Sequence, residues 1–126
     1  MTTRLLALLI AGAACAPAHP AAAVSVVTDP AATPREKYAA SRLEEALEKS
    51  GAALPSGFRI LAGVRSSALF AHAESLPDFP AGTSEAFLWQ RQHNDWLIAG
   101  SDASGVLYGC LEFGRQVLAA HKLPQN

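Results

Sequence analysis

The chain has 126 residues, half of which are apolar, and it carries a formal net charge of −1 at pH 7. That length leaves room for one domain, whose core can be buried without disulfide or metal staples. The near-neutral balance, with Lys and Arg scattered, argues against a nucleic-acid partner, because neutralising phosphates requires a basic stripe.

The first 23 residues are typical of a secretory signal peptide. A single positive charge at Arg4 precedes the apolar, uncharged run Leu5–Ala14, which is too short to span a bilayer as a helix. Small residues follow, and Ala21–Ala23 supplies an A-x-A cleavage pattern, so we expect cleavage after Ala23. A buried N-terminal helix is the alternative, but two prolines interrupt the segment and it lacks helical apolar periodicity.

Loss of residues 1–23 changes the properties expected of the mature chain. Arg4 leaves with them, so the 10 basic residues fall by one against 11 acidic residues and the net charge becomes −2. Cys15 leaves too, and the remaining Cys110 cannot form an intramolecular disulfide. Lipid attachment at Cys15 is the alternative to simple cleavage, but Gly12 stands where a lipoprotein site normally has Leu. We expect residues 24–126 to form one exported domain that is not an integral membrane protein.

The mature sequence begins with a predicted strand and a predicted helix. Val24–Thr28 is β-branched and is followed by turn residues, which is typical of a short strand. A helix is expected from Thr33, whose hydroxyl, with Pro34 and Glu36 after it, forms a capping box. Gly51 supplies the C-terminal stop. Helical spacing predicts a packed face of Ala39, Leu43, Ala46 and Leu47, and a solvated charged face that includes Arg42, Glu44, Glu45, Glu48 and Lys49.

The middle of the chain predicts three strands and a variable connection. Phe58–Gly63 is a largely apolar strand, which predicts a central position in the sheet. Ser66–Glu74 has the pattern of a short helix, and prolines make the residues after it a loop. Glu85–Arg91 and Asp95–Gly100 are two strand patterns joined by a connection of hairpin length.

A second helix is expected after Asp102, whose side chain can cap it. Its apolar residues at i, i+3 and i+4 spacing predict a face that packs against the sheet, made of Leu107, Cys110, Leu111, Gly114, Val117 and Leu118. The elements together predict an α/β (α+β) two-layer sandwich in the order β-α-β-(loop or short helix)-β-β-α, with a mixed sheet and the helices on one face.

The sequence offers no catalytic residues, no metal ligands and no cofactor motif. His72, His93 and His121 are far apart and none has a partner at metal-ligand spacing, so we expect surface histidines. Cys110 lies in an apolar helical run and is expected in the core. Trp89 and Trp96 flank the predicted hairpin turn; their rings could bind a glycan by stacking on its sugars, but packing in the core or against another domain is the favoured interpretation.

The segment Leu97–Glu112 reads LIAGSDASGVLYGCLE, an apolar strand followed by Gly, Asp, Gly and Tyr-Gly. It resembles a signature of the β-hexosaminidase domain-2-like module, which also occurs at the N-terminus of α-glucuronidases and related glycoside hydrolases. There it precedes a TIM-barrel catalytic domain. Tyr38–Leu43 looks like the first helix of that module and Ile60–Gly63 like its second strand, so the resemblance runs from about Val24 to Ala120.

The signature also has a physical reading of its own. Asp102 can accept backbone N–H bonds at a helix start, and Gly105 and Gly109 let that helix approach the sheet closely. The hydroxyl of Tyr108 could reach a partner. We expect all four residues to be structural rather than catalytic.

The resemblance implies a non-catalytic accessory domain of glycoside hydrolases that supports a catalytic barrel. The chain departs from the family pattern because it stops at Asn126, whereas a barrel needs about 250 residues and would carry the hydrolytic carboxylates. The expected partner is therefore a catalytic barrel domain or a glycan. A stand-alone extracytoplasmic module that recognises a glycan or a protein, through the sheet face or the loop Leu76–Gly82, is the alternative. A small hydrolase would need a cleft of titratable groups that the sequence does not supply.

Overall fold

A computed structural model describes residues 25–125, so the predicted signal peptide, Val24 and Asn126 lie outside the described residues. In chain order the elements are β1 (Val26–Val27), α1 (Pro34–Ser50), β2 (Arg59–Val64), the 3-10 helix η1 (Ala68–Phe70), β3 (Phe87–Gln92), β4 (Asp95–Gly100) and α2 (Ala103–Ala120). The order of elements and the mixed sheet confirm the predicted α+β fold class.

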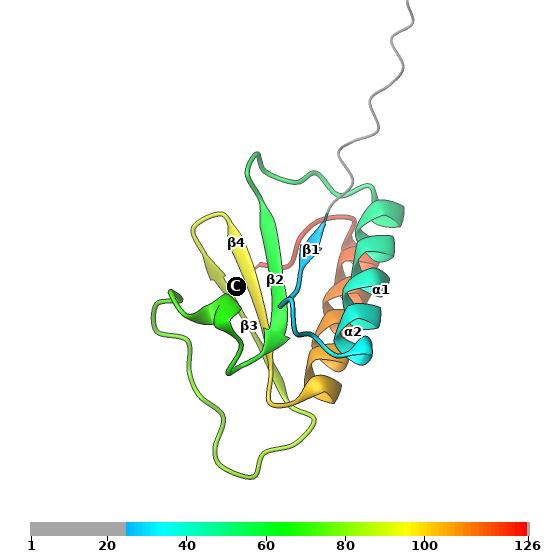
Figure 1. Ribbon diagram of the computed structural model, residues 1–126. Helices are drawn as coiled ribbons and strands as arrows, with labels where there is room; N and C mark the ends of the chain where they lie inside the picture. Colours follow the sequence, from blue (N-terminus) through cyan, green and yellow to red (C-terminus); the bar gives the residue numbers. More distant parts are fainter. Residues whose placement is uncertain (1–24, 126) are drawn as a thin grey trace, which may run out of the picture.

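The sheet has four strands in the order β1-β2-β4-β3. β1, β2 and β4 are parallel to one another, and β3 runs antiparallel to β4 as the predicted hairpin requires. Figure 1 shows α1 and α2 side by side on one face of the sheet, with η1 and the long loop after it on the other side. β2 is interior as predicted, and β3 is an edge strand.

Local sequence signals set both ends of α1. The Thr33 hydroxyl accepts from the N–H of Glu36 at 3.3 Å, and the Glu36 carboxylate accepts from the N–H of Thr33 at 2.8 Å. Gly51 ends the helix with φ at +66°, a conformation that glycine adopts without strain. The predicted packed face is confirmed, because Ala39, Leu43, Ala46 and Leu47 are all buried.

The prediction that Glu44 belongs to the solvated face of α1 is wrong. Its Oε2 accepts a hydrogen bond from the backbone N–H of Val26 in β1 at 2.8 Å, and the residue is half-buried. β1 is two residues long and pairs with β2 alone, so its other side needs a partner, which α1 provides. Glu45 and Glu48 are exposed as predicted.

The buried face of α2 is turned relative to the prediction. Cys110 and Val117 are buried as expected, together with Phe113, but Leu111 and Leu118 are each 40% exposed. The prediction was wrong for these two leucines because two overlapping apolar stripes run along α2, and spacing does not say which one meets the sheet. The sheet meets the stripe that contains Phe113.

The second face of the sheet has a smaller core of its own. Leu61, Leu97 and Ala99 point away from the helices and pack against Phe70 of η1 and Leu76 of the following loop. The helix predicted over Ser66–Glu74 is reduced to the three residues of η1. A loop, rather than a helix, therefore covers this face.

The guanidinium of Arg65 holds that covering loop in place. It donates to the carbonyl of Leu76 at 2.7 Å and to that of Pro77 at 2.8 Å, and it pairs with Asp78 at 3.1 Å. These bonds satisfy loop carbonyls that have no partner in a regular element.

Candidate interaction surface along β3 and α2

β4 passes into α2 through the segment that carries the family resemblance. Asp102 caps α2, because its Oδ1 accepts from the N–H of Gly105 at 2.8 Å, and its Oδ2 accepts from the N–H of Glu85 at 3.0 Å. The N–H of Ser101 donates to the carbonyl of Ala86 at 2.8 Å, and the Ser101 hydroxyl accepts from the N–H of Ala86 at 3.0 Å. The junction thus ties the start of α2 to the residues just before β3.

Two glycines of the same segment bring α2 close to the sheet. A Cβ on Gly105 would lie 2.0 Å from the carbonyl oxygen of Ala86, and a Cβ on Gly109 would lie 2.8 Å from a methyl of Ile98. Real Cβ atoms do not approach other atoms so closely, because the repulsion rises steeply at these distances. The two glycines are therefore required by space, as their place in the signature suggested.

The ionisation of Asp102 responds to the same hydrogen bonds. The N–H groups of Glu85 and Gly105 hold the pKa of the Asp102 carboxyl below its ordinary value of 3.8. A depressed folded-state pKa stabilises the fold above the ordinary pKa, and that stabilisation is lost as the pH falls through the folded-state value.

We therefore expect Asp102→Asn to unfold at a lower urea concentration than the natural chain at pH 7. The amide has one acceptor oxygen, whereas the N–H groups of Glu85 and Gly105 each bond to a different oxygen of the carboxylate. The difference should shrink as the pH falls below about 4. Urea titrations across that range measure it, with Glu48→Gln, which removes an exposed carboxylate of α1, as the control. A pH-independent difference would contradict the role given to the charge.

Both tryptophans of the hairpin lie on the face of the sheet that carries the helices. Trp96 is 2% exposed, and its ring meets that of Phe113 edge-on at 5.4 Å. Trp89 is half-buried, donates from Nε1 to the carbonyl of Gly109 at 3.2 Å, and packs edge-on against Phe113 at 5.1 Å. Stacking on a sugar needs an exposed ring face, which Trp96 does not have. The stacking role stays a prediction for Trp89 alone.

An apolar surface lies where α2 runs beside β3. Phe87, Tyr108, Leu111, Glu112 and Arg115 surround a depression of about 310 Å³, and we call these five residues the β3–α2 ledge. Tyr108 is 44% exposed and Leu111 40% exposed. Exposed apolar side chains that lie together in this way make the ledge a candidate contact site.

The ledge carries one acid and one base. Arg115 Nη2 lies 2.6 Å from Glu112 Oε2, one turn earlier on the same helix. Hydrogen bonding from Arg115 lowers the pKa of the Glu112 carboxyl. Both side chains keep exposed surface, so either can turn to a partner's charge.

Sequence reasoning identified Tyr108 as a residue that could reach a partner but missed the rest of the ledge. Leu111 was assigned to the buried stripe, and the outward side of Phe87 depends on the hairpin's place in the sheet. The available signal was the second stripe of α2, in which Tyr108, Leu111, Arg115 and Leu118 follow one another at spacings of three and four.

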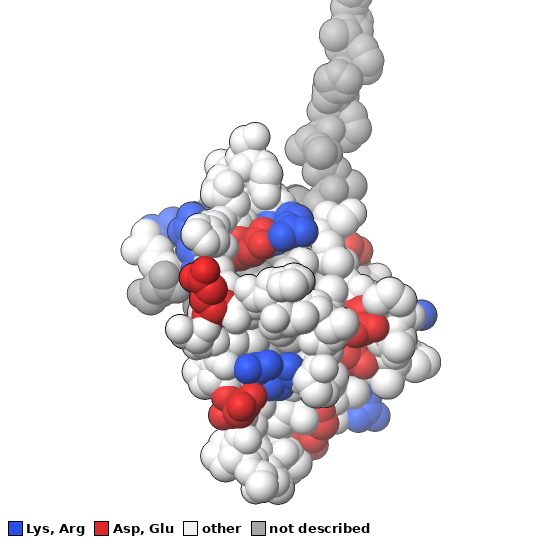
Figure 2. All heavy atoms as spheres, turned by 60° about the vertical axis from the view of Figure 1, so that its left-hand side comes forward, with Lys and Arg blue, Asp and Glu red and all other residues white. Residues whose placement is uncertain are grey.

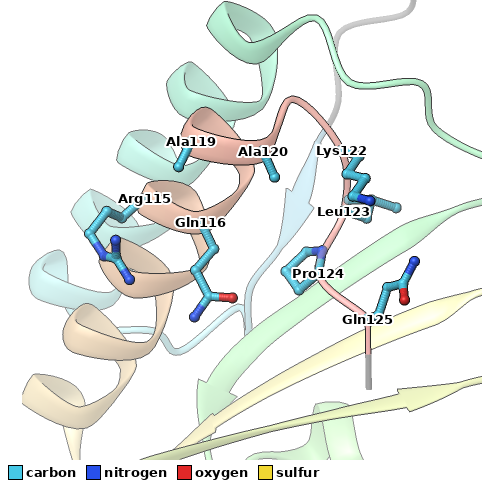
Figure 3. A pocket seen from close by; sticks show the side chains of 8 residues that line it. All are labelled: Arg115, Gln116, Ala119, Ala120, Lys122, Leu123, Pro124 and Gln125. Carbon is cyan, nitrogen blue, oxygen red and sulfur yellow. The ribbon is translucent and has the colours of Figure 1, made fainter.

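A second depression, of about 370 Å³, lies at the C-terminal end of α2. Figure 3 shows Arg115 and Gln116 extending from α2 on one side, with Pro124 and Gln125 on the segment opposite. Arg115 lines both depressions, so the two adjoin along one side of α2.

Metal-binding clusters, the one described cysteine and the histidines were the remaining candidates for reactive groups. Within residues 25–125 no three His, Cys, Asp or Glu side chains come together to hold a metal ion. Cys110 is buried as predicted, and burial raises the pKa of its thiol to about 12, so the nucleophilic thiolate is disfavoured. His72, His93 and His121 are exposed.

Charge is distributed without a dominant sign over the face shown in Figure 2, where acidic and basic side chains are interspersed. Arg59 pairs with Asp95 at 2.7 Å across neighbouring strands. Neither α1 nor α2 is long and apolar enough to cross a bilayer, and the same holds for every other helix of the part that is described.

Comparison with known proteins shows that the chain shares its fold with part of a solved structure. Neither protein-family models nor curated proteins match the chain. Among solved structures, the chain is similar to a GH138 enzyme targeting pectin rhamnogalacturonan II, at 20% identity and a TM-score of 0.60 over 82% of this chain. The chain spans 10% of the length of that enzyme. The likeness is therefore one of domain fold.

Proposed function

We propose that this chain is an exported, non-catalytic accessory domain of a glycoside hydrolase. The observation that supports it is the fold shared with a segment that makes up 10% of a GH138 enzyme. Because this segment is so small a part of the enzyme, most of the enzyme's chain remains to carry the catalytic groups. The resemblance of Leu97–Glu112 to a module found in front of glycosidase barrels points the same way.

The contacts of several described carboxylates also support a non-catalytic role. Hydrolysis of a glycosidic bond uses two carboxyl groups that face each other across a substrate cleft, about 5 to 9.5 Å apart. Here Glu36 and Asp102 accept bonds at helix starts, and Asp95 pairs with Arg59 across neighbouring strands. These groups are occupied in holding the fold.

The outward side of the two helices offers a surface on which a catalytic domain can dock. Large side chains with apolar surface are exposed there, and burying that surface against a partner is favourable. They are Tyr38 on α1 and Leu118 on α2.

The test compares a catalytic domain with and without this chain. Sequencing the transcript beyond the Asn126 codon shows whether a barrel follows in the same frame; otherwise a co-encoded barrel is mixed with the chain. The accessory role predicts that the chain raises the melting temperature of the barrel and does not itself hydrolyse rhamnogalacturonan or chromogenic glycosides. Export predicts that the protein is secreted and that its intact mass corresponds to a chain that begins at Val24.

Two variants make the test specific to the helical surface. Leu118→Lys places a charge in the proposed interface and should abolish most of the stabilisation of the barrel. Val27→Lys changes an apolar side chain of similar exposure, 36% against 40%, on β1 and should leave it intact. Turnover by the chain alone, or glycan binding without any effect on a barrel, would sink the accessory role; the second result would favour the stand-alone binding module.

A further inference from the structure

β3 presents an open hydrogen-bonding edge. It is the last strand of the sheet order, with β4 as its neighbour, and Figure 1 shows it at the side of the sheet. Its six residues, Phe87–Gln92, include no proline and no lysine, two devices that commonly prevent edge strands from pairing. Among residues 25–125, no backbone hydrogen bond reaches its outer side.

The backbone groups on that outer side can be assigned from the ladder with β4. The N–H of Ser101 donates to the carbonyl of Ala86 at 2.8 Å, and the N–H of Ala86 donates to the Ser101 hydroxyl at 3.0 Å, so the backbone groups of Ala86 face Ser101. Bonded and non-bonded pairs alternate along an antiparallel ladder. The backbone of Phe87, Trp89 and Arg91 therefore faces away from β4. These three residues leave N–H and C=O groups open along the edge.

One register of antiparallel pairing with a second copy uses all of these groups. A two-fold axis normal to the sheet and centred on Trp89 sets Trp89 against Trp89, and Phe87 against Arg91 of the second copy. Each of the three pairs then exchanges two backbone hydrogen bonds. The guanidinium of Arg91 comes beside the ring of Phe87 on the other copy, an attractive cation–π arrangement.

The same axis brings the β3–α2 ledges of the two copies together. α2 runs antiparallel to β4 and hence parallel to β3, so the two α2 helices meet antiparallel on the same face of the joined sheet. Trp89 lies at the level of Gly109 and Phe113 on α2. The two-fold rotation reverses the direction of α2 about that level, and so brings Arg115 of one copy towards Tyr108 of the other.

The ledge can therefore meet its own copy. Each ledge holds one acid, Glu112, and one base, Arg115, beside Tyr108 and Leu111, so the two copies bring both signs of charge and the same apolar residues to the interface. A surface that carries both positive and negative charge fits a second copy of itself better than a partner whose charge is all of one sign.

We propose that two copies of this chain join through β3, in the register centred on Trp89, into one continuous eight-stranded sheet. The order would be β1-β2-β4-β3 followed by the same strands in reverse. This goes beyond the accessory role and does not depend on it, because the docking variant Leu118→Lys lies outside the β3 edge.

Oligomeric state and amide exchange test the proposal together. Light scattering of the purified chain between about 1 and 100 µM should show a monomer–dimer equilibrium. Amide-resolved hydrogen exchange should slow with concentration at Phe87, Trp89 and Arg91. Leu88 and Gln90 face β4, so their exchange should not depend on concentration, which makes them an internal control.

A matched pair of variants separates the edge from the side chain. Arg91→Pro removes an outward N–H without removing a bond to β4, and should weaken the dimer by at least about tenfold relative to Arg91→Ala, which keeps that N–H. Circular dichroism checks that both remain folded. If Arg91→Pro does not fold, the concentration dependence of amide exchange in the natural chain tests the proposal instead.

Three results would overturn the proposal. One is a monomer throughout that range with fast exchange at the three outward amides. Another is a monomer whose three outward amides are nevertheless protected, which would mean that a different segment covers the edge. The third is a dimer that Arg91→Pro leaves as strong as Arg91→Ala does.

Discussion

Gly105→Ala is expected to destabilise the fold strongly. The new methyl would lie 2.0 Å from the carbonyl oxygen of Ala86 and 3.2 Å from the Cα of Gly100. Both are backbone atoms, held by the Ser101–Ala86 hydrogen bonds and by β4, so neither can rotate away. The loss should reach roughly 4 kcal/mol, a large part of the stability of a small domain.

Gly114→Ala is the matched control for that prediction, since it adds a methyl to the same helix. Its nearest neighbour is the Cβ of Ala46 at 3.0 Å, so the helices would have to separate by only a few tenths of an ångström. Replacing glycine by alanine inside a helix also gains about 1 kcal/mol of propensity. Urea unfolding should place Gly114→Ala within roughly 1 kcal/mol of the natural chain. Equal losses in the two variants would contradict the role of Gly105.

Phe113→Ala is expected to have the next largest effect. Phe113 is fully buried, and the rings of Trp89 and Trp96 meet it at 5.1 Å and 5.4 Å. Removing a buried phenylalanine ring costs about 3 to 5 kcal/mol, because apolar contacts are lost and a cavity remains. Urea unfolding measures the loss, and the near-ultraviolet circular dichroism of the two tryptophans should weaken with it.

Leu111→Ala serves as the comparison for Phe113→Ala. It truncates an apolar side chain two residues earlier on α2 that is 40% exposed, so it should cost less than about 1 kcal/mol. A larger loss for Leu111→Ala than for Phe113→Ala would mean that the other stripe of α2 meets the sheet, as the spacing alone suggested.

The proposed roles use different surfaces of one rigid unit. The helices offer Tyr38 and Leu118 outward, whereas the open backbone of β3 lies at the sheet edge. The ledge joins the two, because Tyr108 and Leu111 belong to α2 yet adjoin Phe87. The Asp102 junction sets the position of α2 against β3, so a loss at Gly105 should disturb both surfaces at once.

The sequence by itself determined the features that depend on a few adjacent residues. The capping box of Thr33 and Glu36, the stop at Gly51 and the cap at Asp102 were all predicted, because each is a hydrogen bond or a backbone conformation within one turn of chain. The β3–β4 hairpin was predicted for the same reason. Alternation and spacing along each segment were then enough for the fold class.

The tertiary structure alone decided what depends on residues far apart in the chain. Two apolar stripes compete on α2, and only contact with β3 and β4 shows that Phe113 is buried and Leu111 is exposed. Glu44 leaves the solvated face because β1 needs a partner on its open side. The edge position of β3 follows from the sheet order, which no local pattern encodes. The candidate surface is made of such long-range neighbours, and for that reason the sequence indicated one of its residues, Tyr108, and not the others.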